Sequence, residues 1–260
     1  MIDALTELAC RLAVDAGDRA LAGQRASAAG LSTKSTATDL VTVHDRSAEA
    51  TIVAGLTAAR PDDGVVGEEG TAHPGTSGVS WLVDPIDGTT NFVYGLQHWA
   101  TSIAAVDAEG ALAGAVYVPA LGELFAAGRG RGATLNGHPI RCSDRDELAL
   151  ALVATGFGYA PSVRVAQAGL LTHVLGEVRD IRRLGSAAID LCHVACGRVD
   201  AYYEAGLSPW DAAAGELIAR EAGCRSGDFA GGPPDPAELL VAAPAIFDEL
   251  AGLLATIRHH

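Results

Sequence analysis

The chain has 260 residues and a formal net charge of −14 at pH 7, from 18 Lys and Arg against 32 Asp and Glu. This acidic balance argues against a protein that binds nucleic acids through clustered basic residues. Apolar residues make up 49% of the chain and aromatic residues only 5%, so overall disorder is excluded and we expect a core of small aliphatic side chains.

The first part of the chain predicts two helices and two short strands. Apolar residues recur at helical spacing over 2–21 and again from about 44 to 60, which indicates two amphipathic helices. A short buried strand is expected at 64–67 and another strand at 81–83. Between them, 70–80 is rich in Gly, Ser, Thr and Pro and is expected to form a loop.

The pattern changes to strands and turns over 100–140. Strands are expected at 101–106, 112–118 and 123–127, and the turns between them indicate an antiparallel meander. The segment 128–137 is rich in Gly and is expected to form a loop. Its glycine spacing is too weak a signal for a nucleotide-binding motif.

The second part of the chain has one expected strand and three expected helices. The strand is at 149–155, and the helices are at 163–178, at 186–195 and from 209 to about 222. Because strands and helices recur in both parts without strict β-α-β alternation, we expect a layered α+β fold rather than a Rossmann sheet.

The length and the absence of an obvious linker indicate how the chain is divided. We interpret 1–260 as a single domain of two α+β halves, about 1–145 and 146–260, that share the active-site cleft.

Cysteine usage and the first residues bear on the cellular compartment. The five cysteines are scattered and contain no Cys-x-x-Cys pair, so neither a disulfide framework nor a zinc knuckle is expected. Cys192 and Cys196 lie one helical turn apart with His193 between them; we interpret them as buried core residues rather than metal ligands. The chain begins without a basic signal-peptide region and has no run of about 18 apolar residues. We therefore expect a soluble cytoplasmic protein.

Acidic residues stand at the ends of predicted strands and at a predicted helix start in three separate places. These are Glu68-Glu69, Asp84 with Asp87, and Asp211. Taken singly, each has an ordinary explanation: Asp-Pro and Asp-Gly form turns, and Asp211 follows Pro209 at a helix start, where an acid is favourable. If the acids converge on one cleft, their repulsion requires a divalent cation or shifted pKa values.

The most informative segment is Asp-Pro-Ile-Asp-Gly-Thr-Thr at 84–90, directly after an apolar strand. The proline fixes the chain just past the strand, so Asp84 and Asp87 can face one point, with the Ile86 carbonyl as a third oxygen. Gly88 and Thr89 offer backbone N–H groups at the expected start of a short helix. Hard oxygen ligands beside an anion-binding turn point to Mg²⁺ bound next to a substrate phosphate.

The chain resembles the inositol monophosphatase family of Mg²⁺-dependent phosphatases. The resemblance rests on Gly-Glu-Glu at 67–69, Trp-Leu-Val-Asp-Pro-Ile-Asp-Gly-Thr-Thr-Asn-Phe at 81–92 and Trp-Asp-Ala-Ala-Ala-Gly at 210–215. Weaker similarity covers nearly the whole chain, including 184–188 and 34–42, where Lys34 and Asp39 lie near the site in the family pattern. The resemblance implies an alternating α-β-α-β-α layered fold, a homodimer, and hydrolysis of a phosphate monoester by a metal-activated water.

The resemblance also implies two Mg²⁺ ions and a weaker third one. The implied metal ligands are Glu68, Glu69, Asp84, Ile86 through its carbonyl, Asp87 and Asp211. Asp84 would bridge the first two ions, and the third would rely on Glu68 and Glu69. Asp45 resembles the acid that pairs with the Thr89 hydroxyl, and these two residues together with Glu68 would orient and deprotonate the attacking water.

Substrate contacts are implied by the same resemblance. The implied substrate-binding residues are Asp87, Gly88, Thr89, Gly185, Ser186, Ala187, Glu204 and Asp211. Asp-Ala-Tyr-Tyr-Glu at 200–204 resembles the inositol-type branch, in which the carboxylate at Glu204 accepts hydrogen bonds from ring hydroxyls. The alternative is that Glu204 is a solvated residue at a strand end. Arg182 and Arg183, just before the pocket segment, are interpreted as structural or dimer-interface residues.

The expected function is therefore a cytoplasmic, Mg²⁺-dependent phosphatase for myo-inositol 1-phosphate or a close polyol phosphate. Alternative substrates are histidinol phosphate, fructose 1,6-bisphosphate and the 2′-phosphate of NADP. A hypothesis of another class is a regulatory protein that works with the transcription machinery, as some bacterial relatives do. The acidic charge argues against direct nucleic-acid binding, and no membrane partner is expected.

Overall fold

The protein is described from a computed structural model, which covers residues 1–26, 31–33 and 40–257. Lys34 and Asp39 lie outside the described residues. The helices are α1 (Ile2–Ala26), α2 (Val43–Ala59), α3 (Thr89–Val93), the 3-10 turn η1 (Leu148–Leu150), α4 (Pro161–Val174), α5 (Ala187–Ala195), α6 (Pro209–Glu221) and α7 (Phe247–Ile257). The strands are β1 (Leu31–Thr33), β2 (Leu40–Thr42), β3 (Gly64–Gly67), β4 (Ala72–His73), β5 (Ser80–Asp87), β6 (Ala100–Asp107), β7 (Gly110–Val118), β8 (Glu123–Gly128), β9 (Ala133–Leu135), β10 (His138–Pro139), β11 (Leu152–Thr155), β12 (Asp180–Arg182), β13 (Ala201–Ala205), β14 (Arg225–Gly227) and β15 (Glu238–Ala242).

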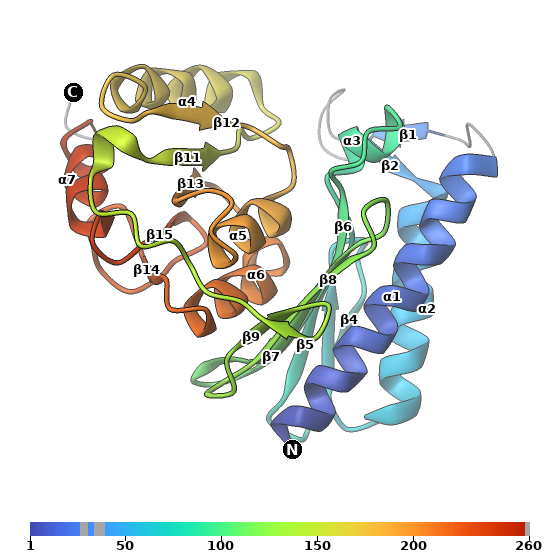
Figure 1. The fold of residues 1–260 in the computed structure, drawn as a ribbon. Helices are drawn as coiled ribbons and strands as arrows, with labels where there is room; N and C mark the ends of the chain where they lie inside the picture. Colours follow the sequence, from blue (N-terminus) through green and yellow to red (C-terminus); the bar gives the residue numbers. More distant parts are fainter. Residues whose placement is uncertain (27–30, 34–39, 258–260) are drawn as a thin grey trace.

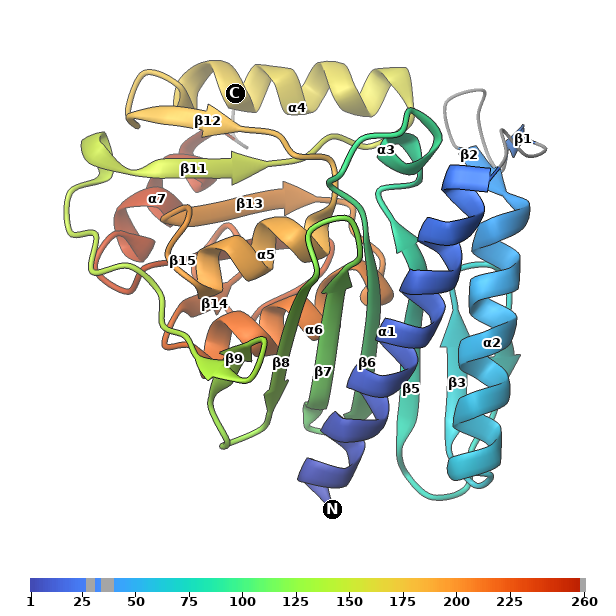
Figure 2. The same cartoon turned by 45° about the vertical axis from the view of Figure 1, so that its right-hand side comes forward.

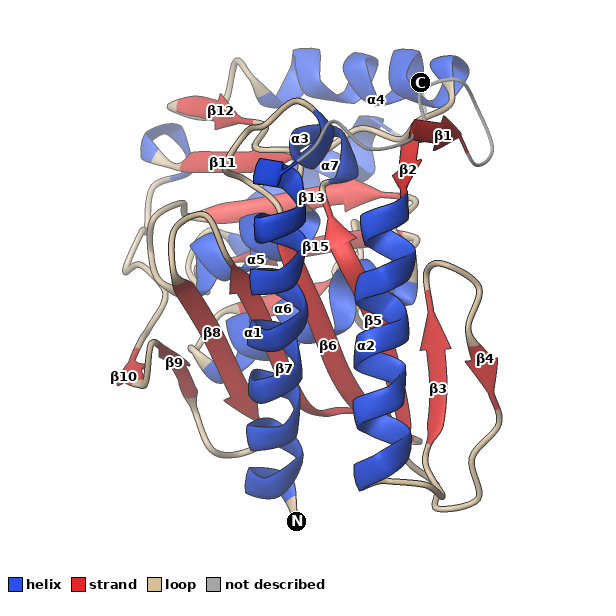
Figure 3. Cartoon of the chain, turned by 90° about the vertical axis from the view of Figure 1, so that its right-hand side faces the viewer, coloured by secondary structure: helices blue, strands red, loops and turns tan. Residues whose placement is uncertain are grey.

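The first half is built on an eight-stranded sheet of order β10-β9-β8-β7-β6-β5-β3-β4. Its pairs are antiparallel except β3 with β5, which run parallel. Helices α1 and α2 lie against one face of this sheet (Figures 1 and 3). The contact is apolar because the helical stripe Leu5, Leu8 and Leu12 packs with Ile52 and with Trp81 of β5.

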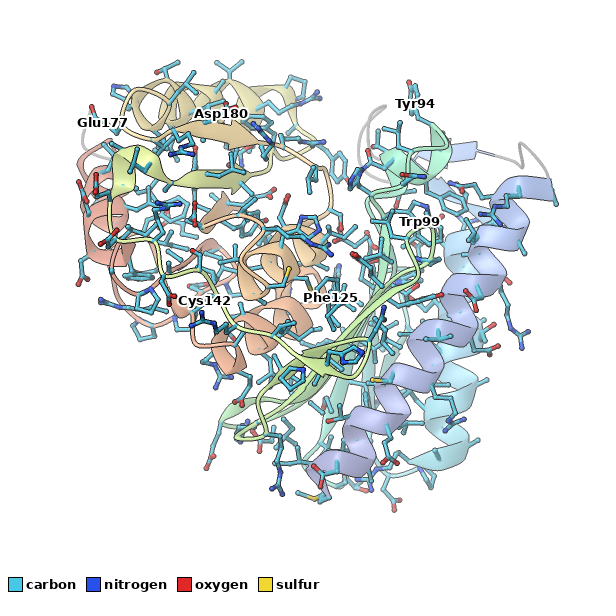
Figure 4. All side chains as sticks on the ribbon, in the orientation of Figure 1. Tyr94, Trp99, Phe125, Cys142, Glu177 and Asp180 are labelled. Carbon is cyan, nitrogen blue, oxygen red and sulfur yellow. The ribbon has the colours of Figure 1, made fainter. Side chains whose placement is uncertain are left out.

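The second half is built on a five-stranded sheet of order β12-β11-β13-β15-β14, in which β11 runs parallel to β12 and β13. Helices α5 and α6 fill the space between the two sheets, and α4 and α7 cover the outer face (Figure 2). Phe125 of β8 lies in this middle layer with Leu191, Tyr202 and Leu217 (Figure 4). The order of layers is helices, sheet, helices, sheet, helices, which confirms the expected layered α+β fold.

Several element boundaries differ from those expected. The first helix continues to Ala26, and the loops expected at 70–80 and 128–137 contain the short strands β4 and β9. The segment expected as one strand at 149–155 begins as the turn η1 and only then becomes β11. Helix α4 begins at Pro161, because proline is favourable at a helix start, and ends at Val174 rather than at 178.

Among the described residues, none of the helices has the length and apolar character needed to span a bilayer.

Candidate active site

A bulge in β5 places two carboxylates on one side of the chain. Asp84 pairs with Ser102 of β6 and Asp87 pairs with Ala100, so β5 carries one residue more than β6 between these pairs. In a regular strand, residues three apart point to opposite faces, and the extra residue removes this alternation. Both side chains consequently line the same pocket.

The turn after β5 requires a glycine. Gly88 has a φ of 91°, in the left-handed region, and its next residue begins α3. A Cβ at this position would also lie 3.0 Å from the Gly185 carbonyl oxygen and 3.1 Å from that of His98. The close approach brings the turn at the end of β5 against the segment that leads into α5.

Asp45 and Thr89 are brought together by a helix N-terminus. The Thr89 hydroxyl lies 3.1 Å from Asp45 Oδ1 and 3.1 Å from the Ile86 carbonyl oxygen. Asp45 Oδ2 accepts hydrogen bonds from the Thr42 backbone N–H and hydroxyl, in a capping box at the start of α2. Burial raises the pKa of Asp45, and the bonds from Thr42 and Thr89 oppose that rise.

Carboxyl groups from three distant parts of the sequence act on one another in the pocket. Asp84 is 2% exposed, and its pKa is raised well above the usual range by burial and by the charges of Glu68, Asp87 and Asp211. Burial raises the pKa of Asp87 to about 6, against the opposing bond from Ser186. Burial is also the main cause of the raised pKa of Asp211, and the charge of Asp87 is the next largest cause. The three acidic motifs therefore converge.

The pocket has a volume of about 340 Å³ and an acidic lining. Its acidic lining residues are Glu68, Asp84, Asp87, Asp190, Glu204 and Asp211. Arg183 is the single basic residue among the described residues that line it. Buried carboxylates with so little compensating charge fit a divalent cation, and an all-oxygen donor set fits Mg²⁺.

The carboxylates share the pocket without forming a finished coordination shell. No three Asp, Glu, His or Cys side chains of the described part of the chain are gathered closely enough to hold an ion as they stand. Glu69, expected at the weak third ion, is not among the residues that line the pocket; its backbone N–H donates to Glu49 Oε2 at 2.7 Å.

The N-terminus of α5 forms the wall opposite β5. Asp87 Oδ2 accepts hydrogen bonds from the Ser186 hydroxyl at 2.6 Å and the Ala188 N–H at 2.7 Å. The Ser186 hydroxyl also accepts from the Ile189 N–H and so caps the helix. One acid of the first half is thus fixed by a helix start of the second half. Gly185, Ser186 and Ala187 line the pocket, where they were expected.

Asn91 ties the same two regions together through its side-chain amide. Its Nδ2 donates to the His98 carbonyl at 2.5 Å and to the Leu184 carbonyl at 2.8 Å. Asn91 is 5% exposed, so water competes little with these bonds. They hold α3 against the segment before α5.

Glu204 faces the pocket from β13. Its Oε2 accepts a hydrogen bond from the Tyr202 hydroxyl at 2.6 Å. Burial raises the pKa of Glu204 to about 7, against the opposing bond from Tyr202. A Cβ at Gly156 would overlap the Glu204 carboxylate, so the glycine leaves room for it. Glu204 is thus partly buried and lines the pocket, and its contact with substrate hydroxyls stays a prediction.

Two residues that line the pocket were not predicted from the sequence as site residues. Asp190 of α5 lines the pocket and is 1% exposed. Its position one helical turn after Ser186 was a usable signal, because residues four apart share a helix face. Arg183, interpreted as structural or as a dimer contact, also lines the pocket.

A wider hollow of about 1050 Å³ lies elsewhere, along α1 beside β8 and β9. Its wall combines apolar residues such as Cys10 and Val14 with acidic residues and arginines. None of the three acidic motifs contributes to it. Convergent chemistry, rather than size, identifies the smaller pocket as the candidate active site.

We expect Mg²⁺ to raise the melting temperature of the protein. The raised pKa values, about 6 for Asp87 and about 7 for Glu204, mean that the folded state binds more protons than the unfolded state between about pH 4 and 7. Stability without metal therefore falls as pH rises through that window. A ligand at a hundred times its Kd adds about 2.7 kcal/mol, which corresponds to several degrees.

The measurement is thermal unfolding after EDTA treatment, at pH 5 and pH 7.5, with NaCl matching the ionic strength of MgCl₂. The Mg²⁺ shift should be larger at pH 7.5, because fewer protons compete with the ion for the carboxyl groups there. An unchanged melting temperature under conditions of Mg²⁺-dependent phosphate release would show that the free protein does not bind the ion appreciably.

Comparison with known proteins finds similar sequences and similar structures over most or all of the chain. The sequence profile described as "Inositol monophosphatase family" matches residues 1–260. An inositol-1-monophosphatase of Mycobacterium bovis is 49% identical over 236 residues, which cover 85% of this chain and 80% of that protein. A Nus factor SuhB of Pasteurella multocida is 41% identical over 216 residues, 82% of this chain and 81% of that protein. The crystal structure of the extragenic suppressor protein suhB from Bartonella henselae matches with a TM-score of 0.91 and 37% identity, over 96% of this chain and 98% of that one.

Proposed function

Because the chain belongs to the inositol monophosphatase family, a family of phosphatases, we propose that it hydrolyses a polyol phosphate with the help of Mg²⁺. The expected substrate is myo-inositol 1-phosphate. The observation that carries this proposal is one pocket that is lined both by acids of the three motifs and by Glu204, a carboxylate outside those motifs that accepts a hydrogen bond from Tyr202. Such a pocket suits a molecule with a phosphate at one end and hydroxyls at the other.

The acids of the three motifs would hold the ions. Glu68, Asp84 and the Ile86 carbonyl suit a first Mg²⁺, and Asp84 with Asp87 and Asp211 suits a second. Bound Mg²⁺ supplies positive charge for the phosphate and lowers the pKa of a water molecule. A weaker third ion at Glu68 and Glu69 stays a prediction of the family resemblance.

The remaining chemistry belongs to side chains and backbone groups of the pocket. The Thr89 hydroxyl donates to Asp45 and can accept a hydrogen bond from the attacking water, whose proton Glu68, or Asp45 through Thr89, can take. The N–H groups of Gly88 and Thr89 start α3, where an anion is favourable, and would bind the phosphate oxygens as charge develops. Glu204 would accept hydrogen bonds from substrate hydroxyls and orient the ring.

Initial rates of phosphate release test the proposal. The panel contains myo-inositol 1-phosphate, histidinol phosphate, fructose 1,6-bisphosphate, NADP and p-nitrophenyl phosphate, each with Mg²⁺ and with EDTA. We expect the highest kcat/KM for the inositol ester and no release in EDTA. A clear preference for another ester would replace the substrate, and full activity in EDTA would remove the role of Mg²⁺.

A second candidate function follows from a relative's name. The Pasteurella multocida protein is a Nus factor, which favours a partner in the transcription machinery. Co-elution of this protein with purified RNA polymerase, for the wild type and for a phosphatase-inactive variant, would support it. The net charge of −14 favours a protein partner over direct contact with RNA.

Three more expectations are part of the proposal. The family resemblance implies a homodimer, which sedimentation velocity would test. A cytoplasmic location stays a prediction. We interpret 1–260 as one domain, because the pocket takes residues from both halves.

A further inference from the structure

A buried carboxyl group with an unused oxygen lies on α5. Asp190 is 1% exposed, and its Oδ1 has no hydrogen-bond partner among the described residues. The side chain lines the candidate active site, together with Glu204 of β13. Asp190 belongs to none of the three acidic motifs and was assigned no part in the chemistry above.

The surroundings of Asp190 disfavour a buried charge. Two acids, Glu204 and Asp87, act on it as like charges; Arg183 and the N–H of Leu184 act in the opposite sense. Burial is the largest influence and raises the pKa of Asp190 well above the usual range. A buried polar atom without a partner costs stability, and a bound ligand can supply the missing partner.

The position of Asp190 suggests what that ligand is. It stands four residues after Ser186, whose hydroxyl binds Asp87, so it lies one helical turn further from the metal-binding acids. Glu204, already assigned to substrate hydroxyls, faces the same pocket from the neighbouring strand. A carboxyl group can accept a hydrogen bond when ionised and donate one when protonated, and a substrate hydroxyl can satisfy either need.

We propose that Asp190 is a specificity-determining residue that binds a second hydroxyl of the polyol, beside the hydroxyl bound by Glu204. This inference rests on the proposed function. Two acids on two elements would together recognise two hydroxyls of one ring. An ester without hydroxyls would leave Asp190 as it is in the free protein.

The test compares Asp190→Ala with Asp190→Asn on two esters. For myo-inositol 1-phosphate, loss of a bond to a carboxyl group in Asp190→Ala should lower kcat/KM about tenfold to a hundredfold. Asp190→Asn keeps a hydrogen-bonding group of the same shape and should lose less. For p-nitrophenyl phosphate, both variants should change far less. The melting temperature without substrate should stay the same or rise, because an unsatisfied buried group has been removed.

Asp180→Asn, on the exposed strand β12 of the same half, is the matched control and should change neither rate. Equal losses on both esters together with a lower melting temperature would show that Asp190 only supports α5, and would overturn the inference. An unchanged inositol ester rate in Asp190→Ala would overturn it as well. A wild type that hydrolyses the aryl ester but no polyol phosphate would overturn the proposed function and this inference with it.

Discussion

Asp84→Asn should abolish phosphate release and leave the fold intact. The charges of Glu68, Asp87 and Asp211 all raise the pKa of Asp84. In the proposed function, Asp84 would serve as a ligand for both Mg²⁺ ions. Bound metal contributes several kcal/mol to the transition state, so we expect a loss of about a thousandfold or more. The fold should survive because the substitution removes a buried like charge and keeps the side-chain shape.

Three measurements decide the outcome for Asp84→Asn. Circular dichroism should match that of the wild type, the Mg²⁺-dependent rise in melting temperature should shrink, and phosphate release should vanish. Asp144→Asn is the control, because the Asp144 side chain is 83% exposed and outside the pocket. A rate near that of the wild type at saturating Mg²⁺ would contradict the assignment of Asp84 to the metal.

Glu204→Gln should separate the substrate class from the chemistry. This carboxylate is assigned hydroxyls of the substrate and no contact with metal or phosphate. Loss of a charge-assisted hydrogen bond costs about 1.5 to 3 kcal/mol, so kcat/KM for myo-inositol 1-phosphate should fall roughly tenfold to a hundredfold. Hydrolysis of p-nitrophenyl phosphate should change far less, because the metal-binding acids and Thr89 are untouched.

Two companion variants sharpen this experiment. Gly156→Ala should reproduce the selective loss, since a methyl group there would push the Glu204 carboxylate aside without altering its chemistry. Glu177→Gln, at an exposed position after α4 (Figure 4), should be silent. Equal losses on both esters would show that Glu204 supports the site structurally. Equal retention would return weight to the alternative phosphomonoesters.

The parts of the fold that the sequence predicted have a repeated local pattern. Helices α1, α2, α5 and α6 carry apolar residues at helical spacing, and the meander of β6, β7 and β8 is marked by its turns. Strands β12 and β14 were not predicted, because three residues are too few to show alternation. Their partners in the sheet, rather than their own residues, stabilise them.

Helix α7 was also not predicted, although its sequence carries a signal. Leu250, Ala251 and Leu254 are buried at helical spacing, and Asp248 and Glu249 occupy the first turn. The strand β15 before it, Glu-Leu-Leu-Val-Ala, pairs with β13 and β14. Its apolar run is equally typical of a buried helix, and the distinction needs those partners.

The candidate site also has residues that could be predicted from the sequence and residues that could not. The acids of the three motifs are adjacent to sequence features with a fixed geometry, such as the proline and glycine that flank Asp84 and Asp87. The contribution of Arg183 and Asp190 depends on how α5 packs against β13, which no local pattern specifies. The bulge in β5 is likewise visible only from the pairing with β6.

The crowded acids at the end of β5 also affect how this protein would respond to selection in the laboratory. A screen for heat resistance carried out in a chelator would favour replacement of Asp84 or Asp190 by a neutral residue, because the first change relieves repulsion and the second removes an unmet hydrogen bond. A variant selected at Asp84 would be more heat-stable and catalytically inactive. Directed evolution of a more heat-stable enzyme would therefore need Mg²⁺ and an activity assay in every round, so that Asp84 is retained for its part in catalysis.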